Sequence, residues 1–263
     1  MFPQLWVVVF LCVFVLGVGL TSIPLKRYFS TPKTYLYFLN AFAMPYHDLP
    51  GVFVNQYYTT VNGSLWTIPI ELLSYIGISL VFLLGGLWKE EGQRKATVIF
   101  HVIGTSIFMS LTIVLMFIEP AGILLRVINP IALFWEGVLF YDFRELISLR
   151  WDLGFVSLVG VIFFLFTPWI CLGIVLFFPY LVCVLCFRTK QVRRDCLLTK
   201  ISYEIYLCGW PIQQMIVHFG GGAMNPTTNF LMAVPLTMLM GMFIYWVVEK
   251  THKFFKHSID TKC

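Results

Sequence analysis

The stretch VNGSLWTIPIELLSYIGISLVFLLGGL, residues 61–87, decides the fold of this chain. It begins with Asn62-Gly63, a pair that is typical of turns, followed by Ser64, a residue type that favours the N-cap of a helix. From Leu65 onward the stretch is almost entirely apolar and is long enough to cross a bilayer as a helix. Glu71 is the one acidic residue in that run. Because a charge inside a membrane is costly, we take Glu71 as a functional candidate.

The composition of the whole chain indicates the same class of protein. Of the 263 residues, 59% are hydrophobic and only 12% are charged, and the mean hydropathy is +0.84. A soluble domain usually has about 25% charged residues. The sequence therefore predicts an all-α protein, a polytopic bundle of transmembrane helices. The net charge of +5 does not indicate nucleic acid as a partner, because the basic residues cluster in short loops, as membrane topology requires.

Eight apolar segments are candidate transmembrane helices, each needing roughly 20 residues to span the bilayer. They are residues 5–23, 65–87, 97–118, 130–141, 153–166, 169–185, 201–218 and 230–248. The fourth and fifth are short, which is consistent with tilted or re-entrant helices. Pro168 lies between the fifth and sixth, so we expect a tight hairpin there.

The distribution of Lys and Arg orients these spans. With a cytoplasmic N-terminus, 14 of the 18 Lys and Arg residues fall on the cytoplasmic side, which is the positive-inside pattern. Both termini are therefore predicted to be cytoplasmic, and residues 24–63 to lie outside or at the outer surface. The basic loop at residues 188–200 is explained by topology alone, and attraction of an anionic cosubstrate is the alternative.

Two helices have polar residues at helical spacing. On a helix that starts at Ser64, the side chains of Thr67, Glu71 and Ser74 share one face, and Pro69 predicts a kink beside Glu71. This face is either a polar active-site face or a structural one. In the structural case Ser64 only caps the helix, and Glu71 pairs with a buried donor.

The second polar face lies on residues 201–218. Ser202, Tyr206, Gly209 and Gln213 share one side of this helix, and Gly209 is expected to allow close helix approach. Hydrogen bonding between helices is an equally good interpretation of this face.

Other polar residues are weaker candidates. Glu136 lies in a short apolar span and is a possible site residue, although a structural role is the simpler interpretation. His47, next to Asp48, is a possible general base at the outer surface. His101 and His218 lie near the ends of spans, where we expect them to be interfacial or packed.

Three blocks of sequence together resemble the acyltransferase-3 family of integral membrane O-acyltransferases. They are LPGVF at 49–53 with Asn55, NGSLWT at 62–67 with Glu71, and SYEIYL at 202–207 followed by WPIQQ at 210–214. A weaker block, FWEG at 134–137, resembles a Gly-containing helix in the middle of family members. The order and spacing of the blocks agree over nearly the whole chain.

The resemblance implies an enzyme of the bacterial cytoplasmic membrane. It would transfer an acyl group, typically acetyl from acetyl-CoA, to a hydroxyl of an extracytoplasmic polysaccharide or glycolipid of the cell envelope. Acyl-CoA is then the cosubstrate, and the partners are membrane lipid and the glycan acceptor. Independently of the resemblance, no metal is expected, because Cys183 and Cys186 have no second Cys or His pair near them in the sequence. By the same resemblance, the catalytic positions are Ser64 and Glu71. The substrate-binding positions are Asn62, Trp66, Tyr206 and Gln213.

The chain departs from the family at its N-terminal side. Family members have further spans there, with an arginine and a histidine that are held to be essential, and an arginine-rich motif. The sequence is therefore interpreted as one acyltransferase-3-like domain over residues 1–263, truncated at its N-terminus relative to the family. A transporter or flippase-like bundle and an inactive remnant of the family are the alternative interpretations.

Overall fold

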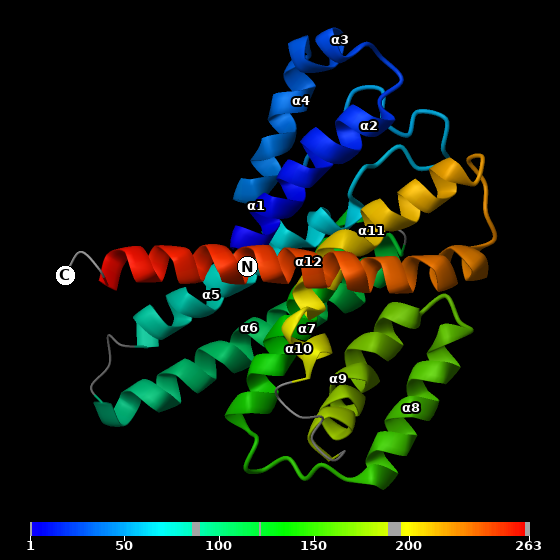
Figure 1. The fold of residues 1–263 in the computed structure, drawn as a ribbon. Helices are drawn as coiled ribbons and strands as arrows, with labels where there is room; N and C mark the ends of the chain where they lie inside the picture. The colour runs from blue at the N-terminus through cyan, green and yellow to red at the C-terminus, as the bar shows by residue number, and fades with distance from the viewer. Residues whose placement is uncertain (1, 86–89, 121, 189–195, 261–263) are drawn as a thin grey trace. The chain divides into compact units, whose positions relative to one another are not determined.

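Every regular element of the computed structural model, in the part of the chain that it describes, is a helix (Figure 1). The structure describes residues 2–85, 90–120, 122–188 and 196–260. Within those residues, six helical stretches are long and apolar enough to cross a membrane: Phe2–Leu20, Gly63–Gly85, Arg94–Ile118, Ile123–Asp142, Ile170–Arg188 and Pro226–Lys253. The predicted all-α fold with multiple apolar spans is therefore confirmed.

Helices also form at the two remaining predicted spans. The fifth predicted span is α8 (Trp151–Leu165), which has 15 residues and is shorter than a full span. The seventh is α11 (Ser202–Phe219), which is long enough but carries a glutamate and two glutamines. Because neither helix is among the six stretches, the number of eight spans stays a prediction.

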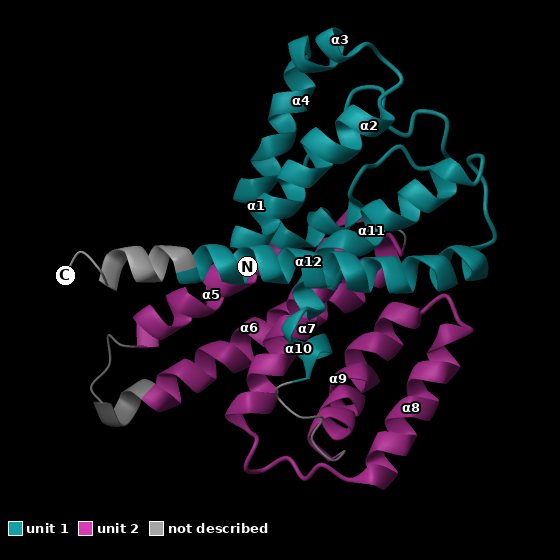
Figure 2. Cartoon of the chain, in the orientation of Figure 1, with its two compact units in different colours: residues 1–69, 193–263 teal, residues 70–192 magenta. Residues whose placement is uncertain are grey.

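The chain divides into two compact units (Figure 2). Unit 1 contains residues 1–69 and 193–263, and unit 2 contains residues 70–192. The boundary falls near the start of α5 (Ile68–Gly85), whose first two residues belong to unit 1. The assignment of one domain to residues 1–263 stays a prediction.

Unit 1 combines long helices with an irregular outer segment. Its helices are α1 (Phe2–Leu11), α2 (Val18–Leu20), α3 (Leu25–Ser30), α4 (Pro32–Leu36), α10 (Leu197–Lys200), α11 and α12 (Pro226–Asp260). α11 and α12 pack against each other. A Cβ on Gly241 of α12 would lie 3.2 Å from the side chain of Ile205, a tight contact that shows how closely the two helices approach at this point. Gly209, the predicted site of close approach, has no atom within 4 Å of an added Cβ in the described part of the chain, so that prediction is wrong.

The first span of unit 1 is interrupted by a π-helical segment, η1 (Cys12–Gly17). A π turn leaves a backbone carbonyl without its usual helical donor. The hydroxyl of Tyr28, a fully buried residue of α3, donates to the carbonyl of Val13 at 3.0 Å. Burial raises the pKa of the Tyr28 phenol, so this hydroxyl stays a neutral donor. Gly17 leaves space for the Tyr28 ring.

Unit 2 is built from helices joined by short connections. It contains most of α5, then α6 (Glu90–Ile118), α7 (Ile123–Asp142), α8 and α9 (Ile170–Arg188). Its buried apolar cluster is formed by Ile70, Ile128, Ile131 and Trp135. The predicted hairpin around Pro168 is present, since α8 and α9 pack closely. Gly160 lies against Phe177, and Gly173 lies against Phe164.

The fourth predicted span is longer than expected. The helix α7 begins at Ile123 rather than at residue 130, and it runs for 20 residues with Pro130 in its interior. A proline removes one backbone donor from a helix, but membrane helices tolerate this where neighbouring groups compensate. The proposed start at Pro130 was therefore wrong, and α7 has the length of a full span.

Candidate functional site: a groove beside the Asn62–Thr67 turn

The turn before the second span is capped by Asn62 rather than by Ser64. Residues Gly63–Thr67 form a short 3-10 helix, η3, and the side chain of Asn62 accepts a hydrogen bond from the Ser64 amide at 3.0 Å. The prediction of Ser64 as the N-cap is therefore wrong by two positions. Pro69 is the second residue of α5, where a missing N–H costs little. The proline therefore lies in the first turn of α5 rather than in the middle of the helix.

The same turn is attached to α11 by side-chain hydrogen bonds. The fully buried Asn62 donates through Nδ2 to the carbonyl of Leu207 at 2.9 Å. The hydroxyl of Tyr206 donates to the Ser64 carbonyl at 2.6 Å and also contacts the Thr67 hydroxyl. A Cβ on Gly63 would lie 2.7 Å from the indole of Trp210, so only glycine fits there. Two sequence blocks that are far apart in the chain thus meet along one face of α11.

A groove of about 410 Å³ lies in unit 1, one turn further along α11. Three aromatic rings line it, those of Tyr57, Tyr58 and Trp210. Tyr57 and Tyr58 are exposed, by 88% and 58%. The rings of Tyr58 and Trp210 meet edge to face with centroids 6.0 Å apart. The indole nitrogen of Trp210 donates to the Thr60 carbonyl at 3.1 Å, which fixes the ring in place.

Amide side chains provide the polar part of the groove. They are those of Gln56, Gln213, Gln214 and Asn229. Gln214 donates to the carbonyls of Tyr58 and Thr60, and Gln56 donates to the carbonyl of Gln214 at 3.0 Å. The oxygens Gln56 Oε1 and Asn229 Oδ1 are buried and have no hydrogen-bond partner among the described residues. Such acceptors are suited to the hydroxyl donors of a ligand.

The structure places the predicted site residues in different surroundings. Asn62, Ser64 and Tyr206 belong to the network on α11, and Gln213 lines the groove. Trp66 is 38% exposed and does not line the groove. Ser202, the first residue of the predicted polar face on α11, bonds the Thr199 carbonyl at the start of the helix instead.

Three further candidates lie outside this network. Glu71 is half-buried in the first turn of α5 and belongs to unit 2. Glu136, also in unit 2, is buried beside a small cavity bordered by Phe140, Pro179 and Tyr180. His47 lies in the loop of unit 1, where its carbonyl accepts from the Val61 amide at 2.8 Å.

Of the basic loop at 188–200, residues 189–195 lie outside the described part of the chain.

Sequence reasoning missed four residues of the groove: Gln56, Tyr57, Tyr58 and Gln214. The first three lie in an irregular loop, which has no periodicity to reveal which side chains face inward. Gln214 lies in the WPIQQ motif, but helical spacing places Gln213 and not Gln214 on the predicted polar face of α11. The run Gln56-Tyr57-Tyr58 was the available signal, because adjacent aromatic and amide side chains in an outer loop are typical of binding surfaces.

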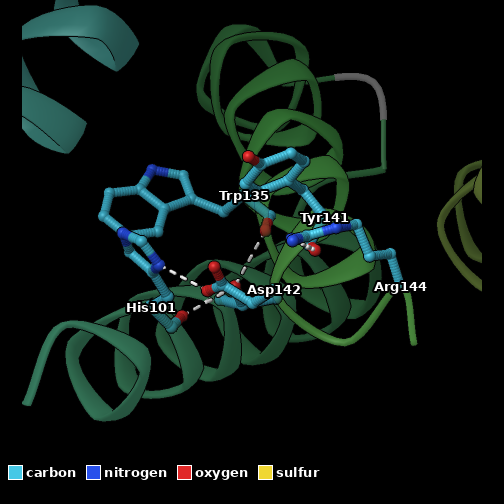
Figure 3. A network of polar contacts seen from close by, with 6 residues as sticks. His101, Trp135, Tyr141, Asp142 and Arg144 are labelled. Carbon is cyan, nitrogen blue, oxygen red and sulfur yellow. Dashed lines mark hydrogen bonds and ion pairs between the residues drawn. The ribbon is translucent and has the colours of Figure 1, made fainter. Parts of the chain in front are cut away.

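A second polar feature lies in unit 2, between α6 and α7 (Figure 3). Nδ1 of His101 is 2.6 Å from Oδ2 of Asp142. His101 is 2% exposed, and the side chain of Asp142 is 14% exposed. His101 is therefore packed, which is one of the two environments predicted for it. Its carboxylate partner Asp142 was not predicted. Within the described residues, no group of three or more His, Cys, Asp or Glu side chains is arranged to hold a metal ion.

No known family model matches this chain, and no curated protein or solved structure matches it.

Proposed function

We propose that the protein is a membrane O-acyltransferase that transfers an acyl group, specifically acetyl, from acyl-CoA to a hydroxyl of an extracytoplasmic polysaccharide or glycolipid. The observation that carries this proposal is the groove of unit 1, in which exposed aromatic rings stand beside unpaired amide oxygens. A sugar presents apolar C–H faces and many hydroxyl donors. Aromatic faces carry partial negative charge and bind such C–H faces, and amide oxygens accept from hydroxyls.

The location of the groove supports the same acceptor. Its aromatic loop belongs to residues 24–63, the segment that the charge pattern predicts to be on the outer side. The Asn62–Thr67 block, one of the three on which the family resemblance rests, contacts α11 directly beside the groove. The resemblance and the groove therefore point to the same region of unit 1.

Acyl transfer requires a base that removes the proton of the acceptor hydroxyl, and donors that stabilise the oxyanion. In this proposal the Ser64 hydroxyl and the Gln213 amide are the donors in unit 1. The cytoplasmic termini and the bacterial cytoplasmic membrane are part of the same proposal.

The test is O-acetylation of envelope glycan in a strain that lacks the gene and is complemented with this chain. We expect the unaltered chain to restore acetyl esters and Trp210→Ala to remove most of them, because the ring is part of the groove. The matched control is Trp246→Ala, since Trp246 is 54% exposed on α12 and carries Lys250 over its ring. Equal acetylation by the two variants would contradict the proposal that the groove binds the glycan acceptor.

A different result would favour the other interpretations. If the chain restores no esters but drives uptake of a labelled sugar into vesicles, the protein is a transporter. If it does neither, the remnant interpretation gains support.

A further inference from the structure

The His101–Asp142 pair has the arrangement of an oriented imidazole base (Figure 3). Asp142 is the last residue of α7, and its carboxylate faces Nδ1 of His101 on α6. An ionised carboxylate has no proton to donate. When the carboxylate is ionised, the proton of this hydrogen bond lies on Nδ1, and a neutral ring then has its lone pair on Nε2.

Nε2 of His101 is buried and has no hydrogen-bond partner among the residues that the structure describes. A buried polar atom without a partner is costly and calls for an explanation. The ring packs edge to face against two aromatic side chains, since its centroid lies 6.0 Å from those of both Phe82 and Trp135. The imidazole is thus packed between rings while Nε2 is buried and unpaired among the described residues.

The surrounding helix backbone keeps this geometry rigid. The Thr105 hydroxyl bridges the carbonyl of His101 at 2.8 Å and that of Trp135 at 3.1 Å, which links α6 to α7. A Cβ on Gly104 would lie 2.7 Å from the indole of Trp135, so glycine is needed for the ring to fit. Beyond the pair, the nearby polar groups in Figure 3 are Tyr141 and Arg144, whose guanidinium lies 4.5 Å from the centre of the Tyr141 ring.

A groove of about 480 Å³ in unit 2 is bordered by both members of the pair. The rest of its lining is mainly apolar, with Ile78, Leu133, Phe134 and Val138 among the residues. A ligand that fits this groove would have an apolar body, with any polar group placed near His101 and Asp142.

We propose that His101 and Asp142 form a proton-accepting centre for a ligand with an apolar chain and one hydroxyl or thiol. The ligand O–H or S–H bond breaks, its proton moves to His101 Nε2, and the electron pair stays on the ligand oxygen or sulfur. No atom is oxidised or reduced. Asp142 is a positioning residue, because it holds the ring and stabilises the imidazolium that forms. This centre lies within unit 2 and does not depend on the function proposed for the groove of unit 1.

The first test measures the chemical availability of Nε2. The full chain in lipid nanodiscs is treated with diethyl pyrocarbonate, which reacts with unprotonated imidazole nitrogens, and modification of His101 is followed by mass spectrometry. We expect His101 to react in the unaltered protein. Asp142→Ala should slow the reaction by about tenfold, because it removes a charge-assisted hydrogen bond. Asp142→Glu should restore part of the rate.

The matched control is Ser106→Ala, which removes a hydrogen bond to the Val102 carbonyl on an exposed part of α6. Its rate should equal that of the unaltered protein. Absence of reaction at His101, or the same rate in Asp142→Ala, would overturn the proposal. The ¹⁵N spectrum of the unaltered protein with labelled histidine shows which ring nitrogen of His101 carries the proton, and it does not require that an Asp142 variant folds. The variant His101→Gln assigns the signals. A proton on Nε2 of the neutral ring would also overturn the proposal.

The second test addresses the ligand class. 1-Octanol has an apolar chain and one hydroxyl, and 1-methoxyoctane has a similar chain without a donor. We expect octanol to slow the modification of His101 by about fivefold, as one hydrogen bond allows, and methoxyoctane to leave it unchanged. Equal protection by the two compounds, or none by octanol, would contradict the assignment of an O–H or S–H donor.

Discussion

Unit 1 uses polar side chains to hold irregular backbone, whereas unit 2 holds its helices together largely with rings and glycines. In unit 1, Asn62, Gln56, Gln214 and Trp210 each donate to backbone carbonyls far away in the sequence. In unit 2, Gly104, Gly160 and Gly173 lie against aromatic rings.

The difference follows from the backbone. A helix satisfies its own peptide groups, but a loop in an apolar environment needs side chains to do so. The polar groups of unit 1 are therefore largely explained by folding. In unit 2 the helices do not need a buried His101–Asp142 pair, which is why that pair is a candidate for function.

The largest effect on stability is expected in the loop network of unit 1. Asn62→Ala leaves the Ser64 amide and the Leu207 carbonyl without their partner, at a cost of roughly 3–4 kcal/mol in the free energy of unfolding. Denaturant titration of the protein in detergent measures this. Ser79→Ala, which removes an exposed bond to the Tyr75 carbonyl, should change stability by less than about 0.5 kcal/mol. A small loss in Asn62→Ala would mean that the network does not hold the turn.

The His101–Asp142 pair should matter to stability only when it is broken on one side. His101→Leu or Asp142→Leu alone leaves the other polar side chain without its partner and should cost about 1–3 kcal/mol. The double variant should recover to within about 1 kcal/mol of the unaltered protein, because an apolar pair needs no hydrogen bond. A double variant that is as unstable as both single losses added together would show that the two side chains are not energetically coupled, which would contradict the pairing.

Glycine packing of unit 2 should tolerate little added volume. In Gly173→Ala the new methyl group would overlap Cβ of Phe164, and such overpacking costs about 2 kcal/mol. The control in unit 1 is Gly209→Ala, where the added Cβ meets nothing within 4 Å and the better helix propensity of Ala should leave stability unchanged or slightly raised. Thermal unfolding of both variants in the same detergent makes the comparison. Equal melting temperatures of the two variants would mean that α8 and α9 pack more loosely than the contact between Gly173 and Phe164 indicates.

The smallest effect is expected for Tyr206→Phe. The variant loses the hydroxyl that donates to the Ser64 carbonyl, and because Tyr206 is 38% exposed, water replaces much of that bond at a cost of about 1 kcal/mol or less. Stability and glycan O-acetylation are measured together. A large loss of acetylation with near-normal stability would indicate that Tyr206 contacts substrate, as the family resemblance predicts.

The apolar runs of the sequence were sufficient to predict where the helices lie. All eight predicted segments contain helices, and the hairpin at Pro168 is present. Residue patterns predicted the first and last residues of the helices less well. The cap at Asn62 and the early start of α7 at Ile123 depend on which backbone groups find partners, and single-sequence spacing does not show this.

The sequence by itself determined the fold class, because hydrophobic length and helical periodicity are local properties. A stretch of about 20 apolar residues is long enough to cross a bilayer as a helix whatever its neighbours are. It also showed that Asn62, Ser64, Tyr206 and Gln213 occur in motifs. Only the tertiary structure decided which of them lie together, and it added the loop residues Gln56–Tyr58. It alone paired His101 with Asp142, which are 41 residues apart. Such contacts depend on how two helices pack, and packing is set by many side chains acting together rather than by any one segment.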